Sequence, residues 1–173
     1  GRLEHILIDP NVLSAANIIN GLSFGENGIL WMATSSGLYS LELENRKIVP
    51  YYFIVEDKHI CSYTNIARIG PVIYLGTMGQ GIACFDTRTH KFDSYLDVGC
   101  NVISSLSCDG KDLLYVGTDG NGVHFISTKQ GRIVRSFQHE VGKGGSLRSN
   151  SVYSLLVDRG GLIWVGFYQL GLD

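Results

Sequence analysis

One short pattern occurs four times in this sequence, and its spacing decides the class of fold. Each copy is a run of apolar residues that holds one aromatic side chain and is followed, six or seven residues after that side chain, by a glycine. The aromatic residues are Trp31, Tyr74, Tyr115 and Trp164, at intervals of 43, 41 and 49 residues. The glycines are Gly37, Gly81, Gly122 and Gly171, at intervals of 44, 41 and 49 residues. Periods of this length are typical of repeat folds, in which each unit is one supersecondary structure.

Each unit reads as four short strands separated by turns, which is the content of one propeller blade. The strand before the aromatic run and the run itself are joined by Gly- and Asp-containing turns that are typical of hairpins. The predicted blade units are residues 18–55, 60–96 and 100–138, followed by an incomplete unit at 150–173. Residues 47–55 are expected as the fourth strand of the first unit, and residues 3–8 as a lone strand from a preceding blade. The predicted fold is all-β, a β-propeller fragment of about three to four four-stranded antiparallel blades.

The aromatic runs carry a second structural signal, because they do not alternate between apolar and polar residues. A sheet with one face in water alternates, whereas a strand buried on both faces is continuously apolar. A propeller blade is covered on both faces by its neighbours. Gly76, Gly117 and Gly166 lie inside these strands and indicate a close approach by an adjacent sheet, and Ala33 occupies the same place in the first unit.

Composition excludes several classes of protein. Glycine makes up 22 of 173 residues, and only 17% of the chain is charged, which disfavours a helical bundle and a disordered chain. The net charge is −2 without a basic run, so no nucleic-acid partner is expected. No stretch approaches the roughly 20 apolar residues of a membrane span. Direct membrane contact is therefore not expected, and residues 1–10 do not have the pattern of a signal peptide.

The repeat units resemble a known family. Residues 152–166, VYSLLVDRGGLIWVG, and the preceding SLRSNSV at residues 146–152 are similar to the two-component regulator propeller repeat. Units differ from the family pattern at single positions, such as Gly25, where the family has an aspartate. The resemblance implies the periplasmic sensor region of a hybrid two-component histidine kinase of the Bacteroides type, which recognises an oligosaccharide. It implies signal transduction without catalysis by this chain. Two alternatives remain: a propeller lyase or hydrolase acting on glycans, and a protein-interaction scaffold.

Candidate ligand-binding residues lie in the loops between the second and third strands, because in propellers these loops and the connections between blades share one rim. The candidates are Gln80, Asp119, Asn121, Tyr168 and Gln169. Asp, Asn and Gln can bind sugar hydroxyls, and a Tyr ring can stack on a pyranose. For each residue taken singly, the sequence favours the alternative that it is an ordinary turn residue.

No catalytic residue, cofactor or metal site is predicted. The segment DGNG at residues 119–122 suggests a calcium loop, but the twelfth position of such a loop would be Gln130, so a hairpin turn is favoured. Cys61, Cys84, Cys100 and Cys108 do not have the spacing of zinc ligands. A disulfide between Cys61 and Cys100 and four buried thiols both remain open, and the sequence favours the thiols.

An incomplete set of blades exposes a blade face at each end. We expect these faces to be covered by another copy of the chain or by further blades of a longer protein.

Overall fold

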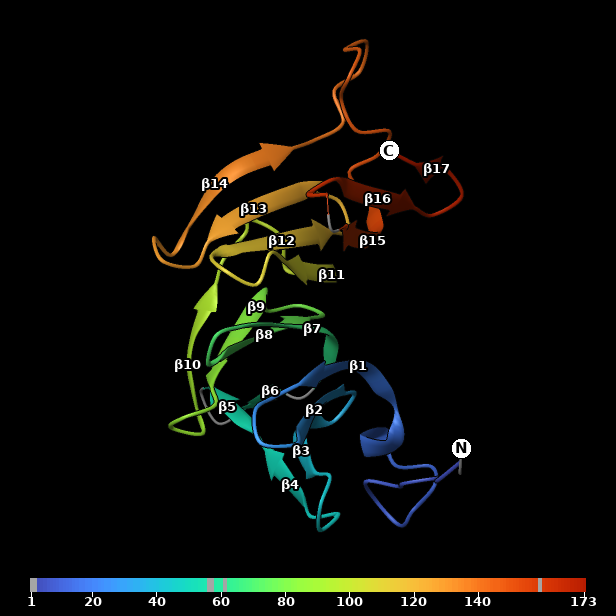
Figure 1. The fold of residues 1–173 in the computed structure, drawn as a ribbon. Coiled ribbons are helices and arrows are strands. Elements are labelled where there is room, and N and C mark those ends of the chain that lie inside the picture. Colours follow the sequence, from blue (N-terminus) through green and yellow to red (C-terminus); the bar gives the residue numbers. More distant parts are fainter. Residues whose placement is uncertain (1–2, 56–57, 61, 159) are drawn as a thin grey trace. The chain divides into compact units, whose positions relative to one another are not determined.

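The computed structural model describes residues 3–55, 58–60, 62–158 and 160–173. They form β-strands and one 3-10 turn, η1 (Ala15–Asn17), in two compact units, residues 1–63 and 64–173 (Figure 1). No helix among these residues has the length and apolar character needed to cross a membrane. The two units are described separately.

The first unit contains one four-stranded antiparallel sheet and a small hairpin. The sheet runs in chain order through β1 (Ile19–Phe24), β2 (Ile29–Thr34), β3 (Gly37–Glu42) and β4 (Ile48–Tyr51). The hairpin is β5 (Phe53–Val55) with β6 (Lys58–Ile60). The expected single strand at residues 47–55 is therefore wrong. Tyr51 pairs with Leu38, next to the first residue of β3, so the chain beyond Tyr51 has no partner left in the sheet and forms a hairpin with β6 instead.

The second unit contains three sheets in which the strands again follow chain order. The first is β7 (Tyr63–Ile69), β8 (Val72–Thr77), β9 (Ile82–Asp86) and β10 (Lys91–Leu96). The second is β11 (Ile103–Cys108), β12 (Leu113–Thr118), β13 (Val123–Ser127) and β14 (Arg132–Phe137). The third is β15 (Val152–Val157), β16 (Ile163–Phe167) and β17 (Gly171–Leu172). The predicted all-β propeller-fragment fold is confirmed, and each of the four sheets lies within one of the predicted blade units. We refer to the sheets as blades 1 to 4 in chain order.

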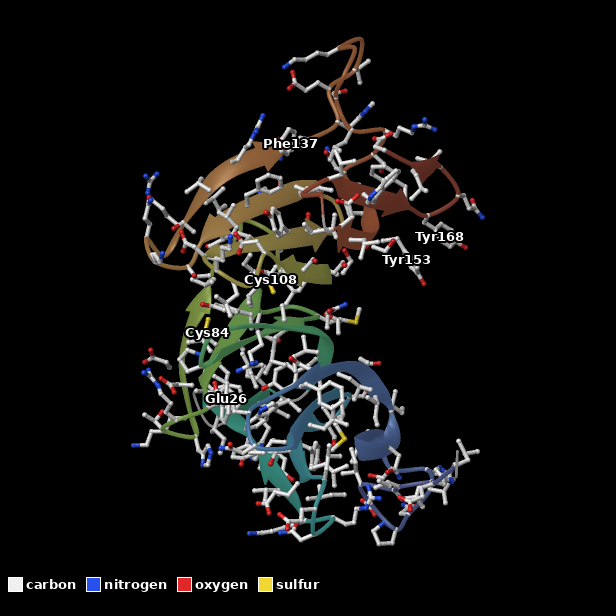
Figure 2. The ribbon with its side chains drawn as sticks, viewed as in Figure 1. Glu26, Cys84, Cys108, Phe137, Tyr153 and Tyr168 are labelled. Carbon is white, nitrogen blue, oxygen red and sulfur yellow. The ribbon has the colours of Figure 1, made fainter. Side chains whose placement is uncertain are left out.

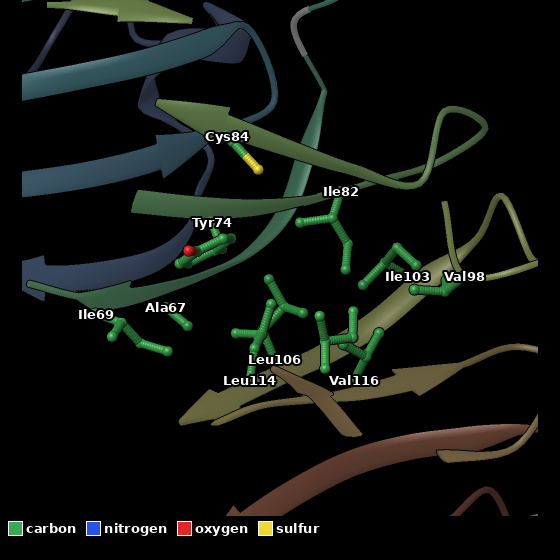
Figure 3. Packing of buried hydrophobic residues seen from close by; sticks show 11 residues of the cluster. Ala67, Ile69, Tyr74, Ile82, Cys84, Val98, Ile103, Leu106, Leu114 and Val116 are labelled. Carbon is green, nitrogen blue, oxygen red and sulfur yellow. The ribbon is translucent and has the colours of Figure 1, made fainter. Parts of the chain in front are cut away.

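Blades 2 and 3 pack face to face through one apolar core (Figure 3). Blade 2 contributes residues such as Tyr74 and Ile82, and blade 3 contributes Ile103, Leu106 and Leu114. Ile103 and Leu114 are fully buried. A second core lies between blades 3 and 4, where Val123 packs with Val152 and Val165. The face of each middle blade is thus covered by the next blade, as the apolar second strands predicted.

The strand glycines permit this packing. A Cβ at Gly76 would lie 2.8 Å from Ile103 Cγ2, and a Cβ at Gly117 would lie 2.7 Å from Val152 Cγ1, both on the following blade. The predicted close approach of an adjacent sheet is confirmed at these two positions. At Gly166 a Cβ would instead meet the Ser154 hydroxyl of its own sheet.

Residues 3–8 do not form a strand, which corrects the expected lone strand of a preceding blade. A strand needs a hydrogen-bonded partner, and none of the sheets in the described part of the chain includes these residues. The segment that follows is organised by the Asn17 side chain, which accepts from the backbone N–H groups of Ile8 at 2.8 Å and Asp9 at 3.1 Å. Asn17 also donates to the carbonyls of Asp9 and Asn11, each at 2.9 Å. This side chain holds residues 8–11 beside η1.

An aspartate closes the first hairpin of blades 3 and 4. Asp158 Oδ1 accepts from the N–H groups of Gly160 and Leu162, and its Oδ2 accepts from the indole N–H of Trp164 at 3.2 Å. The Trp164 hydrogen bond is the main cause of the lowered pKa of Asp158. Blade 1 has Gly25 there, and a Cβ on Gly25 would lie 2.6 Å from Nε1 of Trp31. The departure from the family pattern therefore makes room for the Trp31 ring.

Asp109 closes the corresponding hairpin of blade 3, and its Oδ1 accepts from the N–H groups of Lys111, Asp112 and Leu113 at 2.8–3.0 Å. Partial burial raises the pKa of Asp109, but the three N–H donors outweigh it and the pKa is lowered. Asp109→Ala is expected to lower the free energy of unfolding by about 1 kcal/mol near pH 7, because three donors lose their acceptor.

Because the pKa of Asp109 is lower in the folded chain, its stabilisation is present above the unfolded pKa of about 4 and is lost as pH falls through the folded value. The difference between wild type and Asp109→Ala should therefore shrink at acid pH. Urea denaturation at several pH values measures it, with Asp93→Ala on the exposed face of β10 as the control. An equal difference at pH 7 and pH 2 would contradict the assignment.

Candidate functional site

One rim of the second unit is built by loops that reach from each blade to the next. The β8–β9 loop bonds to the connector before β11, where Gly79 N donates to Asn101 O at 2.8 Å. The β12–β13 loop does the same one blade later, where Gly120 N donates to Asn150 O at 3.0 Å. Isolated β-bridges join Met78 to Val102 and Asp119 to Ser151. The strand loops and the connections between blades therefore share one rim, as expected from the repeat.

A groove of about 660 Å³ lies along this rim. Its volume falls within the range of small-molecule sites. It is lined by loop and inner-strand residues of blades 2, 3 and 4 and of the connectors between them: Thr64, Met78, Val102, Ile103, Ser104, Asp119, Ser151, Val152, Tyr153 and Tyr168.

Two tyrosines form one wall of the groove. The rings of Tyr153 and Tyr168 lie with their centroids 6.2 Å apart and their planes at 47°. Both side chains are largely exposed, and Figure 2 shows them together at one side of blade 4. Tyr168 was predicted from the sequence, whereas Tyr153 was not. The available signal was strand alternation: Val152 is buried, so the next residue of β15 faces away from the core.

The polar groups of the groove are few. Asp119 supplies the one acidic side chain among the groove-lining residues that the structure describes. Thr64 Oγ1 donates to Ile103 O at 2.6 Å and is thereby already engaged. Ser104 Oγ is buried and has no hydrogen-bond partner among the described residues. The groove thus offers aromatic faces, one carboxylate and hydroxyl groups, which together suit a neutral polyol better than an anionic ligand.

The other three candidates lie elsewhere. Asn121 is engaged within the fold: its Nδ2 donates to Val98 O at 3.1 Å and its Oδ1 accepts from Gln138 Nε2 at 2.6 Å. Gln80 and Gln169 are exposed turn residues, and Gln169 has a φ of 60°. None of the three lines the groove. The structure therefore brings together Asp119 and Tyr168 of the five candidates.

Three of the four cysteines and the DGNG segment at residues 119–122 lie in the described part of the chain, where their contacts are those of the fold itself. Cys100 and Cys108 are free thiols, and Cys108 Sγ donates to Arg68 O at 3.4 Å, while Cys84 is buried in the core between blades 2 and 3. Cys61 lies outside the described residues. Residues 119–122 form a turn in which Thr118 N donates to Gly122 O at 3.1 Å. Within the described part of the chain, no three His, Cys, Asp or Glu side chains gather as metal ligands.

Comparison with family models identifies the repeat in the last blade. Residues 146–169 match the two component regulator propeller model. The match spans the connector before β15, β15 itself and β16, and it confirms the family resemblance of this segment. A two-component regulator propeller repeat therefore builds the inner strand and both tyrosines of the groove wall. The search of curated proteins found no match.

Solved structures share the fold at low sequence identity. The extracellular domain of BT3049 from B. thetaiotaomicron, described as a hybrid two-component system, superposes with a TM-score of 0.71 at 17% identity over 90% of this chain and 23% of that one. The extracellular domain of BT4673 from the same bacterium gives 0.57 at 18% over 90% and 27%. The designed protein Ika4 gives 0.68 at 15% over 90% and 88%. This chain thus spans about a quarter of the two bacterial domains.

Proposed function

We propose that this chain is part of the periplasmic ligand-sensing propeller of a hybrid two-component sensor kinase and that it recognises an oligosaccharide. The regulator propeller repeat at residues 146–169 and the shared fold with extracellular domains of such systems support a sensor role. That the ligand is an oligosaccharide is what the family resemblance implies, and the chemistry of the groove supports it.

The observation that carries the proposal is the exposed Tyr153–Tyr168 wall beside Asp119 in a groove of about 660 Å³. Aromatic faces bind the apolar faces of pyranose rings, while a carboxylate accepts hydrogen bonds from sugar hydroxyls. Both tyrosines are about two-thirds exposed, and such residues in a concave site are available to a ligand.

The groove also offers a route for signalling. Met78, Asp119 and Tyr168 belong to the loops of three successive blades, and the loops of blades 2 and 3 are bonded to the connector of the next blade. A ligand that contacts all three would favour one arrangement of the blades over another. Its differential affinity for two arrangements would shift the equilibrium of the attached kinase.

The test is binding of a panel of oligosaccharides by calorimetry, to this chain and to any longer extracellular domain that contains it. Tyr168→Ala is expected to weaken binding about fivefold, because stacking of one aromatic ring contributes about 1 kcal/mol. Asp119→Asn is expected to weaken it about fivefold, because one charge-assisted hydrogen bond becomes neutral.

Gln169→Ala is the matched control, since it adjoins Tyr168 in the chain but lies outside the groove. Equal losses in Tyr168→Ala and Gln169→Ala would contradict this site. Release of new reducing ends during incubation would favour a glycan-cleaving enzyme, and binding of none of the oligosaccharides by the longer domain would remove the sugar from the proposal.

A further inference from the structure

The carboxylate of Asp119 is not used by the fold, unlike those of the hairpin aspartates. Asp109 and Asp158 each close a hairpin by accepting backbone N–H groups. At Asp119 only the backbone is engaged: its N–H donates to Val102 O at 3.1 Å, and its carbonyl accepts from the Cys100 thiol at 3.5 Å. No residue that the structure describes donates to the Asp119 carboxylate. The two carboxylate oxygens are therefore available to a ligand in the groove.

An aromatic ring is directed into the same groove by a β-bulge. The β-bridge between Asp119 and Ser151 places Asp119 beside the start of β15, and Ser151 lies two positions before Tyr153. The pairing of β15 with β16 shifts register between Val152 and Ser154, so Tyr153 is the extra residue of the bulge. A bulge re-aims the side chain of its extra residue. Here it turns an exposed tyrosine toward the groove that Asp119 also lines.

The groove carries negative charge that the described residues do not neutralise. None of the described residues that line it is Lys, Arg or His. Arg148, in the connector before β15, is paired with Asp173 at 2.8 Å. The ring faces of Tyr153 and Tyr168 add the negative side of the aromatic quadrupole (Figure 2). One full charge and two ring faces of the same sign therefore meet in one groove.

A protonated amine fits this combination better than a hydroxyl group does. An ammonium group and a carboxylate form a hydrogen bond in which both partners are charged, whereas a hydroxyl supplies a neutral donor. An ammonium group near a tyrosine face also gains a cation–π attraction, which a hydroxyl lacks. Both gains are modest at an exposed site, and together they favour the amine about tenfold.

We propose that the groove recognises a basic amino sugar, that is, a sugar whose amino group is not acetylated and carries a positive charge. The ammonium group binds the Asp119 carboxylate, and the sugar ring lies against the wall formed by Tyr153 and Tyr168. This inference rests on the proposed function, because it specifies which oligosaccharides the groove takes. A uronic acid is disfavoured at the same place, since it brings a second carboxylate beside Asp119.

Calorimetry with matched sugars tests the proposal. The β-1,4-linked trimers of glucosamine, N-acetylglucosamine and glucose differ only in the group on carbon 2, which is an amine, an acetamide or a hydroxyl. Galactosamine, N-acetylgalactosamine and galactose form a second matched set. At about pH 6, below the pKa of an ordinary α-amino group, the free amine is protonated. In at least one set, the free amine is expected to bind about tenfold more tightly than both counterparts.

Asp119→Asn removes the charge and keeps the size of the side chain. The preference for the amine is expected to fall from about tenfold to about threefold or less, because only the cation–π attraction remains. Asp93→Asn is the matched control: it makes the same change of charge on the exposed face of β10, outside the groove, and should leave the preference at about tenfold. Circular dichroism confirms that both variants are folded.

Salt gives a second readout that needs no variant. Raising the NaCl concentration from about 0.1 M to about 1 M shortens the screening length from about 10 Å to about 3 Å. The wild-type preference for the amine is expected to decrease, while the affinity for the matching neutral sugar stays the same.

Four results would overturn the inference, and they differ from those that concern the proposed function. Equal binding of the amine, acetamide and hydroxyl forms would remove the amino sugar and leave a neutral oligosaccharide as the ligand. Asp119→Asn with the full preference would place the amine elsewhere. Spermidine that binds as tightly as the amino sugars would show that charge alone is recognised. Binding of no sugar from either set or from the oligosaccharide panel would remove the proposed ligand as well.

Discussion

Gly117→Val is expected to lower the free energy of unfolding by about 3 kcal/mol, at the upper end of the usual cost of overpacking. A Cβ at this position would lie 2.7 Å from Val152 Cγ1 and 3.3 Å from Leu155 Cδ1. Both neighbours belong to β15, so the new side chain must either push blade 4 away from blade 3 or force its own strand out of register. Either movement costs free energy of folding, because Val152 is tightly packed and only 2% exposed.

Gly144→Val is the matched control for this substitution. Gly144 has no atom within 4 Å of its would-be Cβ and does not have a positive φ, so the same change should alter stability by no more than about 0.5 kcal/mol. Urea denaturation followed by tyrosine and tryptophan fluorescence compares the two. Equal stabilities of both variants would mean that blades 3 and 4 do not approach each other as described.

Ile103→Ala is expected to cost about 2–5 kcal/mol, the range found when a buried isoleucine or leucine is truncated. Ile103 is fully buried in the core between blades 2 and 3, and it also fills the space above Gly76. Val141→Ala, at a residue that is 93% exposed, is the control and should be nearly neutral.

A double-mutant cycle gives this prediction a second readout. Gly76→Ala places a methyl group 2.8 Å from Ile103 Cγ2, so it should destabilise the wild type and cost less in the Ile103→Ala background. The relief should be incomplete, because Thr64 Oγ1 lies 2.9 Å from the same methyl group. Additive effects of the two substitutions would show that these residues do not touch.

The sequence predicted the repeated parts of the fold well because their signals are local. The four sheets lie within the predicted blade units, since each unit is delimited by turn residues and by the period of the repeat. It failed at residues 3–8 and 47–55, where the apolar pattern suits a strand but the outcome depends on a partner strand. Pairing is a tertiary property that no local pattern contains.

In the candidate site, too, some residues were predictable from local sequence signals, whereas others depend on tertiary contacts. The rim was predictable because chain order fixes which loops meet, and this brought Asp119 and Tyr168 into the groove. Asn121 has the side chain of a sugar ligand, but its amide is used by Val98 and Gln138, which lie 23 and 17 residues away in the sequence. Tyr153 was not predicted, because it lies on the inner strand β15 and not in a loop, and this strand also faces the groove.

The long connector between β14 and β15 accounts for the widest interval between repeats. Its base is pinched shut by His139 N, which donates to Asn150 Oδ1 at 2.6 Å, and by Leu147 N, which donates to Gln138 O at 3.3 Å. Near the tip of the connector are Gly142, Gly144 and Gly145. A Cβ on any of these glycines would have no other atom within 4 Å. Because these hydrogen bonds close the base of the connector, residues can be added or removed at its tip while the blades keep their spacing. Insertions or deletions, whether they arise in evolution or by grafting of a reporter peptide, can therefore be accommodated in this connector without changing the packing of the core.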